Sequence, residues 1–207
     1  MIDISRPEVL FNPLTAQIYD LFAWPFVSLT TSKILEYLEP QDIVLEIGSG
    51  TGLATTILAG KVRNVIGVEP SPSMLAKAQE KLARYGLQDK VELLADRAER
   101  LPIPGPVDAV VMSYVLRHIK PDKLTASMTE LKRVMRAGSK LFLADLHLPL
   151  AGAFREVTPA SPNYLVLGVL ALYDPETLVQ YLEGQGFRAV GMYYYPLSFL
   201  AVLEKGA

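Results

Sequence analysis

A glycine-rich turn between a strand-like and a helix-like segment is the feature that most constrains the fold of this chain. Residues 44–52 read Val-Leu-Glu-Ile-Gly-Ser-Gly-Thr-Gly, an apolar run that breaks into glycines at alternate positions. A second apolar run, residues 65–69, ends at Glu69. Glycines let a backbone approach a ligand closely, and an acid at the end of a second strand can accept hydrogen bonds from a ribose diol. Together these features predict a protein that binds a nucleoside-containing cofactor.

The rest of the chain continues the alternation of strand-like and helix-like segments that a parallel sheet covered on both faces requires. Ser71-Pro72 is a typical helix start and Gly86 a typical helix end. We predict an α/β fold, a single-domain, doubly wound and mostly parallel sheet of the Rossmann-like type. Strands are expected at 42–47, 64–69, 91–95, 107–113 and 140–146, and helices at 53–59, 73–85 and 122–136.

The segments outside the central sheet predict an N-terminal helical cap and a C-terminal antiparallel hairpin. Helices are expected at 14–22 and 26–38, separated by Pro25, and at 175–183. The runs 187–195 and 197–204 flank Pro196 and predict the hairpin at one sheet edge. We therefore divide the single domain into a helical cap (1–40), a cofactor-binding core (41–146), an acceptor-side insert (147–173) and a final helix with the hairpin (174–207).

Composition excludes several classes of site and partner. The chain has no cysteine and only two histidines, which excludes disulfides and thiolate sites and argues against zinc. The formal net charge is −2 without a basic stripe, so a nucleic-acid partner is disfavoured. No apolar run reaches the roughly 20 residues of a membrane-spanning helix, and the start of the chain lacks signal-peptide features. We expect a cytoplasmic protein without stable membrane insertion.

The spacing of the three glycines argues against a phosphate-bearing cofactor. Dinucleotide sites use the pattern G-x-G-x-x-G, whereas Gly48, Gly50 and Gly52 give G-x-G-x-G. No Lys-Ser or Lys-Thr pair follows, as it would in a phosphate-binding loop. Glu46 places negative charge beside the turn, which repels a pyrophosphate but attracts an ammonium or a sulfonium. S-adenosylmethionine, which carries both cations and no phosphate, fits this turn better.

Four segments in order resemble the successive motifs of class I S-adenosylmethionine-dependent methyltransferases: residues 44–52, 67–75, 95–102 and 108–119. The similarity is greatest to the small-molecule group that includes ubiquinone/menaquinone and phospholipid N-methyltransferases. Residues 131–143 resemble the helix, turn and strand that follow in this family, although Ala137-Gly138-Ser139 departs from its usual Pro-Gly-Gly. The resemblance implies S-adenosyl-L-methionine as cofactor, and it does not specify the methyl acceptor.

The resemblance, together with the positions of residues at strand ends, indicates which residues bind the cofactor. Glu69 is expected to accept from both ribose hydroxyls, and Asp96 with the following backbone N–H to contact the adenine. Tyr19, on the cap, is expected against the sulfonium or the amino-acid end, where an aromatic face favours a cation. Plainer roles as turn, strand-end or core residues stay open, above all for Met74. The full set is Tyr19, Glu46, Gly48, Gly50, Glu69, Pro70, Met74, Asp96, Arg97 and Ser113.

The two histidines are the candidate catalytic residues. His118 follows the fourth strand, and the unperturbed pKa of imidazole lies near neutrality, as a general base requires. His147, just past the fifth strand, is a second candidate. The alternatives are a capping or supporting role for His118 and a pocket wall for His147. The expected enzyme activity is in-line methyl transfer to an O, N or C nucleophile, with no metal.

The acceptor-side insert predicts the kind of acceptor. Residues 163–172 contain no ionisable group except Tyr164, which indicates an apolar or amphiphilic small molecule, quinone-like or lipid-like. The alternative for this segment is a homodimer interface. Two other functions stay open. A non-catalytic cofactor-binding module would share all the binding motifs, and a nucleotide-dependent oxidoreductase is less consistent with the glycine spacing.

Overall fold

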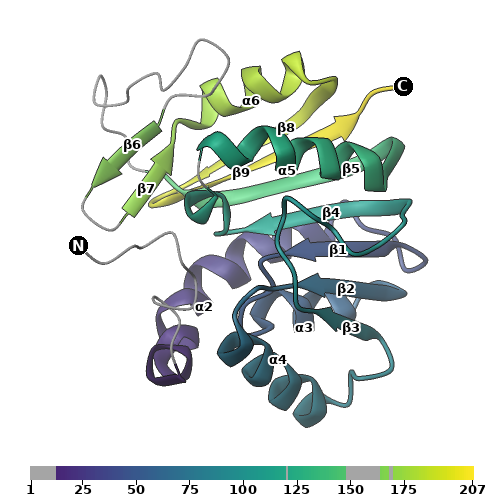
Figure 1. Cartoon of the computed structure of the whole chain (residues 1–207), viewed down its shortest axis with the longest axis vertical. Coiled ribbons are helices and arrows are strands. Elements are labelled where there is room, and N and C mark those ends of the chain that lie inside the picture. Colours follow the sequence, from purple (N-terminus) through teal and green to yellow (C-terminus); the bar gives the residue numbers. More distant parts are fainter. Residues whose placement is uncertain (1–12, 120, 148–163, 168–169) are drawn as a thin grey trace.

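The computed structural model describes residues 13–119, 121–147, 164–167 and 170–207. Its main element is a seven-stranded sheet in the order β3-β2-β1-β4-β5-β9-β8 (Figure 1). The first five strands run parallel, and β9 is antiparallel to both β5 and β8. The strands are β1 (Ile43–Ile47), β2 (Asn64–Val68), β3 (Val91–Leu94), β4 (Val107–Ser113), β5 (Met135–Leu146), β8 (Phe187–Tyr195) and β9 (Ser198–Lys205).

Helices cover both faces of this sheet (Figure 1). On one face, apolar side chains of α2 (Pro13–Leu35) and α3 (Leu53–Ala59) form a core with the sheet, and α4 (Pro72–Tyr85) packs beside α3. On the other face, α5 (Pro121–Val134), α6 (Pro175–Gly184) and the short 3₁₀ helix η1 (Leu116–His118) form a second core. The predicted doubly wound α/β architecture and the C-terminal hairpin are confirmed.

The chain reverses its order between β1 and β4, which are neighbours in the sheet although β2 and β3 intervene in the sequence. In open α/β sheets, ligands bind beyond the carboxyl ends of the strands at such a switch point. The helix that follows β2 begins and ends at the capping residues that the sequence predicts. The Ser71 hydroxyl accepts from the Met74 N–H at the start of α4, and Gly86 ends the helix with φ 65°. The carboxyl ends of β1, β2 and β4 therefore define where a site is to be sought.

The predicted break of the N-terminal cap at Pro25 is wrong. One continuous helix, α2, spans Pro13–Leu35 with Pro25 inside it. A proline in a helix removes one N–H and clashes with the preceding turn, which normally kinks or ends the helix. Here the turns after Pro25 bury Val27 and Ile34 against the sheet. Tertiary packing thus maintains the helix across the proline.

Two further boundaries differ from the sequence prediction. The helix expected at 122–136 ends at Val134, and β5 begins at Met135 rather than at residue 140. Met135 pairs with Val107, and the register shifts between Val107 and Ala109, so extended backbone starts before the Gly138 corner. Most of the acceptor-side insert lies outside the described residues. Its end forms a separate two-stranded antiparallel sheet of β6 (Tyr164–Leu167) and β7 (Leu170–Tyr173).

Among the described residues, no helix has both the length and the apolar run needed to cross a lipid bilayer.

Candidate cofactor site at the carboxyl edge of the sheet

The glycine turn after β1 depends on glycine for two different reasons. Gly48 and Gly50 have φ of 72° and 55°, in the left-handed region that disfavours other residues. A Cβ on Gly48 would also lie 2.5 Å from Cγ2 of Val115, so this position is fixed by close packing against the segment after β4. A Cβ on Gly50 would meet only the Gly48 carbonyl oxygen, at 3.9 Å. The turn is therefore packed at Gly48 and open at Gly50, where a ligand can approach the backbone.

The Glu69 carboxylate is held against this turn from the end of β2. Its Oε2 accepts from the Gly50 N–H at 3.1 Å, and its Oε1 accepts from the Ser71 N–H at 2.8 Å. The side chain is buried. Because a carboxylate oxygen can accept more than one hydrogen bond, this fixed orientation is compatible with ribose hydroxyls as further donors.

Glu46 is a buried acid that forms no ion pair within the described part of the chain. It is 2% exposed, and its Oε2 accepts from the Thr55 hydroxyl at 2.5 Å. Burial raises the pKa of Glu46 to about 8, against the smaller lowering effect of Thr55, and the nearby Glu69 charge raises it further. A cation placed beside Glu46 would favour its charged form, so this side chain is suited to an ammonium or a sulfonium.

Two serines add polar groups to the same place. The hydroxyl oxygens of Ser49 and Ser113 are buried and have no hydrogen-bond partner among the described residues. Both line a small cavity together with Glu46, Gly48 and Gly50. Buried polar groups are almost always paired. A polar ligand at this position could pair with the Ser49 and Ser113 hydroxyls. If the ligand is also cationic, it could pair with Glu46, which forms no ion pair with the described residues.

The cavity beside the glycine turn measures only about 20 Å³, and Val27 of α2 lines its outer side. Asp20 ties α2 to the turn: its carboxylate accepts from the Thr51 hydroxyl and from Nζ of Lys81, the latter at 2.5 Å. The cap helix thus covers this cavity. A ligand group that enters this cavity would lie between α2 and the glycine turn.

The structure places the expected adenine residues at the end of β3, beside Glu69. The Glu69 N–H donates to the Leu94 carbonyl oxygen at 3.0 Å, and Asp96 follows two residues later. Asp96 Oδ1 accepts from the Arg97 N–H at 2.9 Å, and its Oδ2 lies 3.1 Å from Nη2 of the exposed Arg100. An adenine amino group would have to share this carboxylate with Arg100.

The remaining cofactor candidates differ in accessibility. Pro70 is half-buried between Glu69 and the start of α4. Met74 is 2% exposed, which favours its alternative role as a core residue over direct cofactor contact. Tyr19 lies on α2, but its side chain is outside the described residues.

The two histidines occupy separate surroundings at the ends of β4 and β5. Burial, followed by the nearby Arg117 charge, lowers the pKa of His118 to about 4. A general base works best with a pKa near the operating pH, so this environment makes His118 a weak proton acceptor. His147 donates its backbone N–H to the Leu197 carbonyl oxygen, and its ring centroid lies 5.4 Å from that of Tyr194. Its Nδ1 is buried without a hydrogen-bond partner among the described residues.

Sequence reasoning missed several polar residues of this edge. The Thr51 hydroxyl donates to Asp20 and so joins the turn to α2, and the Thr55 hydroxyl donates to Glu46. Threonine and aspartate occur at many positions of a sequence, so these residue types did not indicate such roles. It also missed a cluster beyond β4 and β5, where Arg117 Nη1 lies 2.9 Å from Asp145 Oδ1 and its guanidinium lies 5.6 Å from the Tyr114 ring centroid. Asp145 is recognisable as a strand-end acid, but its partner is set by tertiary packing.

Comparisons with known proteins agree with this geometry. A family model described as a methyltransferase domain matches residues 44–138, which contain β1 to the start of β5. An uncharacterized methyltransferase of Geobacillus sp. (strain WCH70) is 33% identical over 104 residues, 50% of this chain and 46% of its own. A demethylmenaquinone methyltransferase of Porphyromonas gingivalis is 26% identical over 222 residues, 94% of this chain and 89% of its own.

The whole fold also matches solved structures. The structure of a DhpI–SAH complex superposes with a TM-score of 0.74 at 20% identity, covering 98% of this chain and 97% of that one. At this identity the likeness shows the fold alone. The chain spans about half the length of several of the curated relatives that it matches.

Proposed function

Starting from the membership of this chain in the class I S-adenosylmethionine-dependent methyltransferases, we propose that it transfers a methyl group from S-adenosylmethionine to a small apolar or amphiphilic acceptor. The observation that carries the proposal is the buried Glu46 beside the glycine turn, an acid that forms no ion pair with a described residue; Lys81, whose charge acts on it, is paired with Asp20. With a pKa of about 8, this acid is mostly protonated at pH 7 in the free protein. The positive charge of an adenosyl sulfonium with an amino-acid end would favour its ionised form, whereas the negative charge of a dinucleotide would not.

In the proposed complex, each strand end binds a different part of the cofactor. Glu46 receives the ammonium group, Glu69 the ribose hydroxyls, and Asp96 with the Arg97 backbone the adenine. Ser113 and the open side of Gly50 line the position of the amino-acid end. When bound, the cofactor supplies a methyl group on a sulfonium, which is already strongly electrophilic.

The protein's part in the reaction is then mainly alignment and exclusion of water. Holding two reactants in the productive geometry can supply roughly 7–11 kcal/mol of barrier reduction in favourable cases. The low pKa of His118 means that this side chain is neutral at pH 7. We therefore propose that His118 orients the acceptor as a neutral hydrogen-bonding group, and that the acceptor arrives as a competent nucleophile. His147 is proposed as a wall of the same region.

A quinone-like or lipid-like acceptor is proposed on two grounds. The acceptor-side insert is apolar in sequence, and the relative from Porphyromonas gingivalis is a demethylmenaquinone methyltransferase. The part of the insert that the structure describes ends at Tyr173, which is buried and donates its hydroxyl to the Ile119 carbonyl oxygen at 3.3 Å, next to His118. The insert is thus anchored close to the proposed acceptor region.

A methyl-transfer screen tests the proposal. Radiolabelled S-adenosylmethionine is incubated with the protein and separate pools of reduced quinones, phospholipids and amines. We expect label in one pool and its loss in the Glu69→Ala variant, with Glu92→Ala, at an exposed acid on the neighbouring β3, as the matched control. Cofactor binding without labelling of any pool would support a non-catalytic module instead. Binding of NADH in preference to S-adenosylhomocysteine would favour an oxidoreductase.

A further inference from the structure

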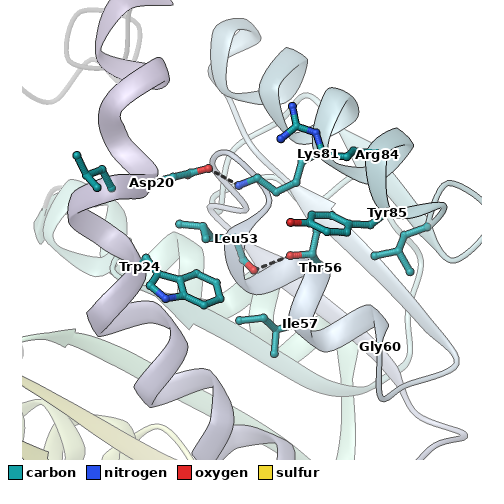
Figure 2. Close-up of a pocket in the computed structure, with 11 residues that line it drawn as sticks. Asp20, Trp24, Leu53, Thr56, Ile57, Gly60, Lys81, Arg84 and Tyr85 are labelled. Carbon is teal, nitrogen blue, oxygen red and sulfur yellow. Dashed lines mark hydrogen bonds and ion pairs between the residues drawn. The ribbon is translucent and has the colours of Figure 1, made fainter.

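A second, larger cavity lies outside the candidate cofactor site, between α2, α3 and α4 (Figure 2). Its volume is about 730 Å³, and none of the cofactor candidates whose side chains the structure describes lines it. Concave sites for small molecules typically measure ~300–1,000 Å³ and are mostly apolar with a few polar groups. The size of this groove therefore matches a small organic ligand.

The walls of the groove are apolar, and its apolar side chains continue onto the surface. Trp24 of α2 faces Leu53 and Ile57 of α3 across the groove (Figure 2). Leu21, Trp24 and Tyr85 are among the few large apolar side chains that are strongly exposed, at 76%, 52% and 63%. Large exposed apolar patches are often interaction sites, and here three exposed apolar side chains line one concavity.

The charged groups of the groove have an excess of one positive charge. Lys81 and Arg84 project from α4, and Asp20 is the only acid among the lining residues. Asp20 is already paired with Lys81, at 2.5 Å. The Arg84 guanidinium has no hydrogen bond or ion pair within the described part of the chain, and it lies beside Lys81 (Figure 2). Arg84 acts on the nearby Glu80 through its charge but forms no ion pair with it, so an anionic group in the groove could bind this guanidinium.

We propose that this groove binds a small amphiphilic anion. The apolar body of the ligand would lie against Trp24 and Ile57, and its carboxylate or phosphate head would bind Arg84 and Lys81. A concave groove formed by three helices accommodates a slender ligand better than it does a flat lipid surface. The unpaired guanidinium selects an anionic head over a neutral or cationic one. Leu53 lines both this groove and the small cavity at the glycine turn, and Asp20 joins the groove to that turn, but the binding of an anion here does not depend on the proposed methyl transfer.

Trp24 provides a direct assay because it is the single tryptophan of the chain. Its fluorescence is followed during titration with decanoate and, separately, with decyl phosphate, each below its critical micelle concentration. Decanol and decyltrimethylammonium serve as neutral and cationic controls. We expect a saturable blue shift with the two anions, a weaker effect with decanol and none with the cation. The stronger of the two anions identifies the preferred head group.

Two variants locate the ligand. Arg84→Gln should weaken anion binding by about two- to fivefold, the range of a solvent-exposed ion pair. Leu21→Asp should also weaken it, because it places a negative charge at the rim on a side chain too exposed to matter for folding. The control is Lys123→Gln, which removes a positive charge from an exposed position of α5, on the other face of the sheet. It should leave the affinity unchanged.

Several results would overturn the proposal. These are the absence of any saturable shift, equal binding of the cation, or an effect of Lys123→Gln as large as that of Arg84→Gln. A shift with vesicles of anionic phospholipid but not with monomeric decanoate would identify a membrane surface as the partner. If the tryptophan emission depends on protein concentration and sedimentation shows a dimer, the occupant of the groove would be a second copy of the chain.

Discussion

Replacing Glu46 with glutamine changes the charge of this buried side chain while keeping its size. The amide oxygen of glutamine can still accept from the Thr55 hydroxyl, which donates to Glu46 at 2.5 Å. The variant therefore isolates the effect of ionising an acid inside the protein. Because burial raises the pKa of Glu46 from 4.5 to about 8, the folded protein binds one more proton than the unfolded chain between these two values.

The sign of the effect follows from this difference. Where the folded state binds more protons, the free energy of unfolding falls as pH rises, by about 1.4 kcal/mol per pH unit for one proton. The stability of the parent should therefore fall from pH 5.5 to 7.5 by on the order of 2–3 kcal/mol more than that of Glu46→Gln. Below pH 4.5 the two proteins should show the same pH dependence.

Urea unfolding at pH 5.5, 6.5 and 7.5 measures this difference directly. Other titrating groups contribute equally to both proteins, so only the difference between parent and variant is interpreted. Glu92→Gln, on the exposed side of β3, serves as the control and should give a difference that does not vary with pH. A pH-independent difference between the parent and Glu46→Gln would show that Glu46 ionises normally in the folded protein, and the argument from its burial would fail.

Three other substitutions test the remaining parts of the site. Glu69→Gln should weaken S-adenosylhomocysteine binding by about tenfold or more and lower the free energy of unfolding by about 1–3 kcal/mol, because the partly buried Gly50 N–H and the buried Ser71 N–H lose a charged acceptor. Calorimetry and urea unfolding measure the two effects, and unchanged affinity would remove Glu69 from the candidate site. Gly48→Ala should lower the free energy of unfolding by about 1–3 kcal/mol, because Gly48 has a positive φ and an added Cβ would clash with Val115. In urea unfolding, the double variant with Val115→Ala should recover part of this loss. The absence of any recovery would contradict the packing argument. His118→Asn should lower the rate of methyl transfer less than tenfold. The pH profile of this rate between pH 6 and 8 should stay unchanged, since the pKa of His118 is about 4. If the variant instead lost an ionisation near neutrality from its pH profile, His118 would be identified as a general base.

Local sequence signals predicted the sheet and much of the edge at which the candidate site lies. Strand and helix positions followed from apolar runs and from caps such as Ser71 and Gly86, which act through nearby backbone groups. Glu46, Glu69, Asp96 and Ser113 could be placed at strand ends because the carboxyl ends of parallel strands share one edge.

Features that depend on long-range packing could not be predicted in this way. The continuation of α2 through Pro25 rests on burial of its later turns against the sheet. The link from Asp20 to Thr51 joins residues 31 positions apart, and neither residue type indicates its partner. The low pKa of His118 likewise arises from burial, which a sequence position after a strand does not reveal.

Calorimetric titration with S-adenosylhomocysteine at pH 7, repeated in buffers with different ionisation enthalpies, tests the central claim most directly. A cation that binds beside Glu46 must convert this acid from its neutral to its charged form, so we expect one site and the release of about one proton per ligand bound. The Glu46→Gln variant should release none. No binding of S-adenosylhomocysteine together with binding of a dinucleotide would contradict the account, as would binding without release of a proton.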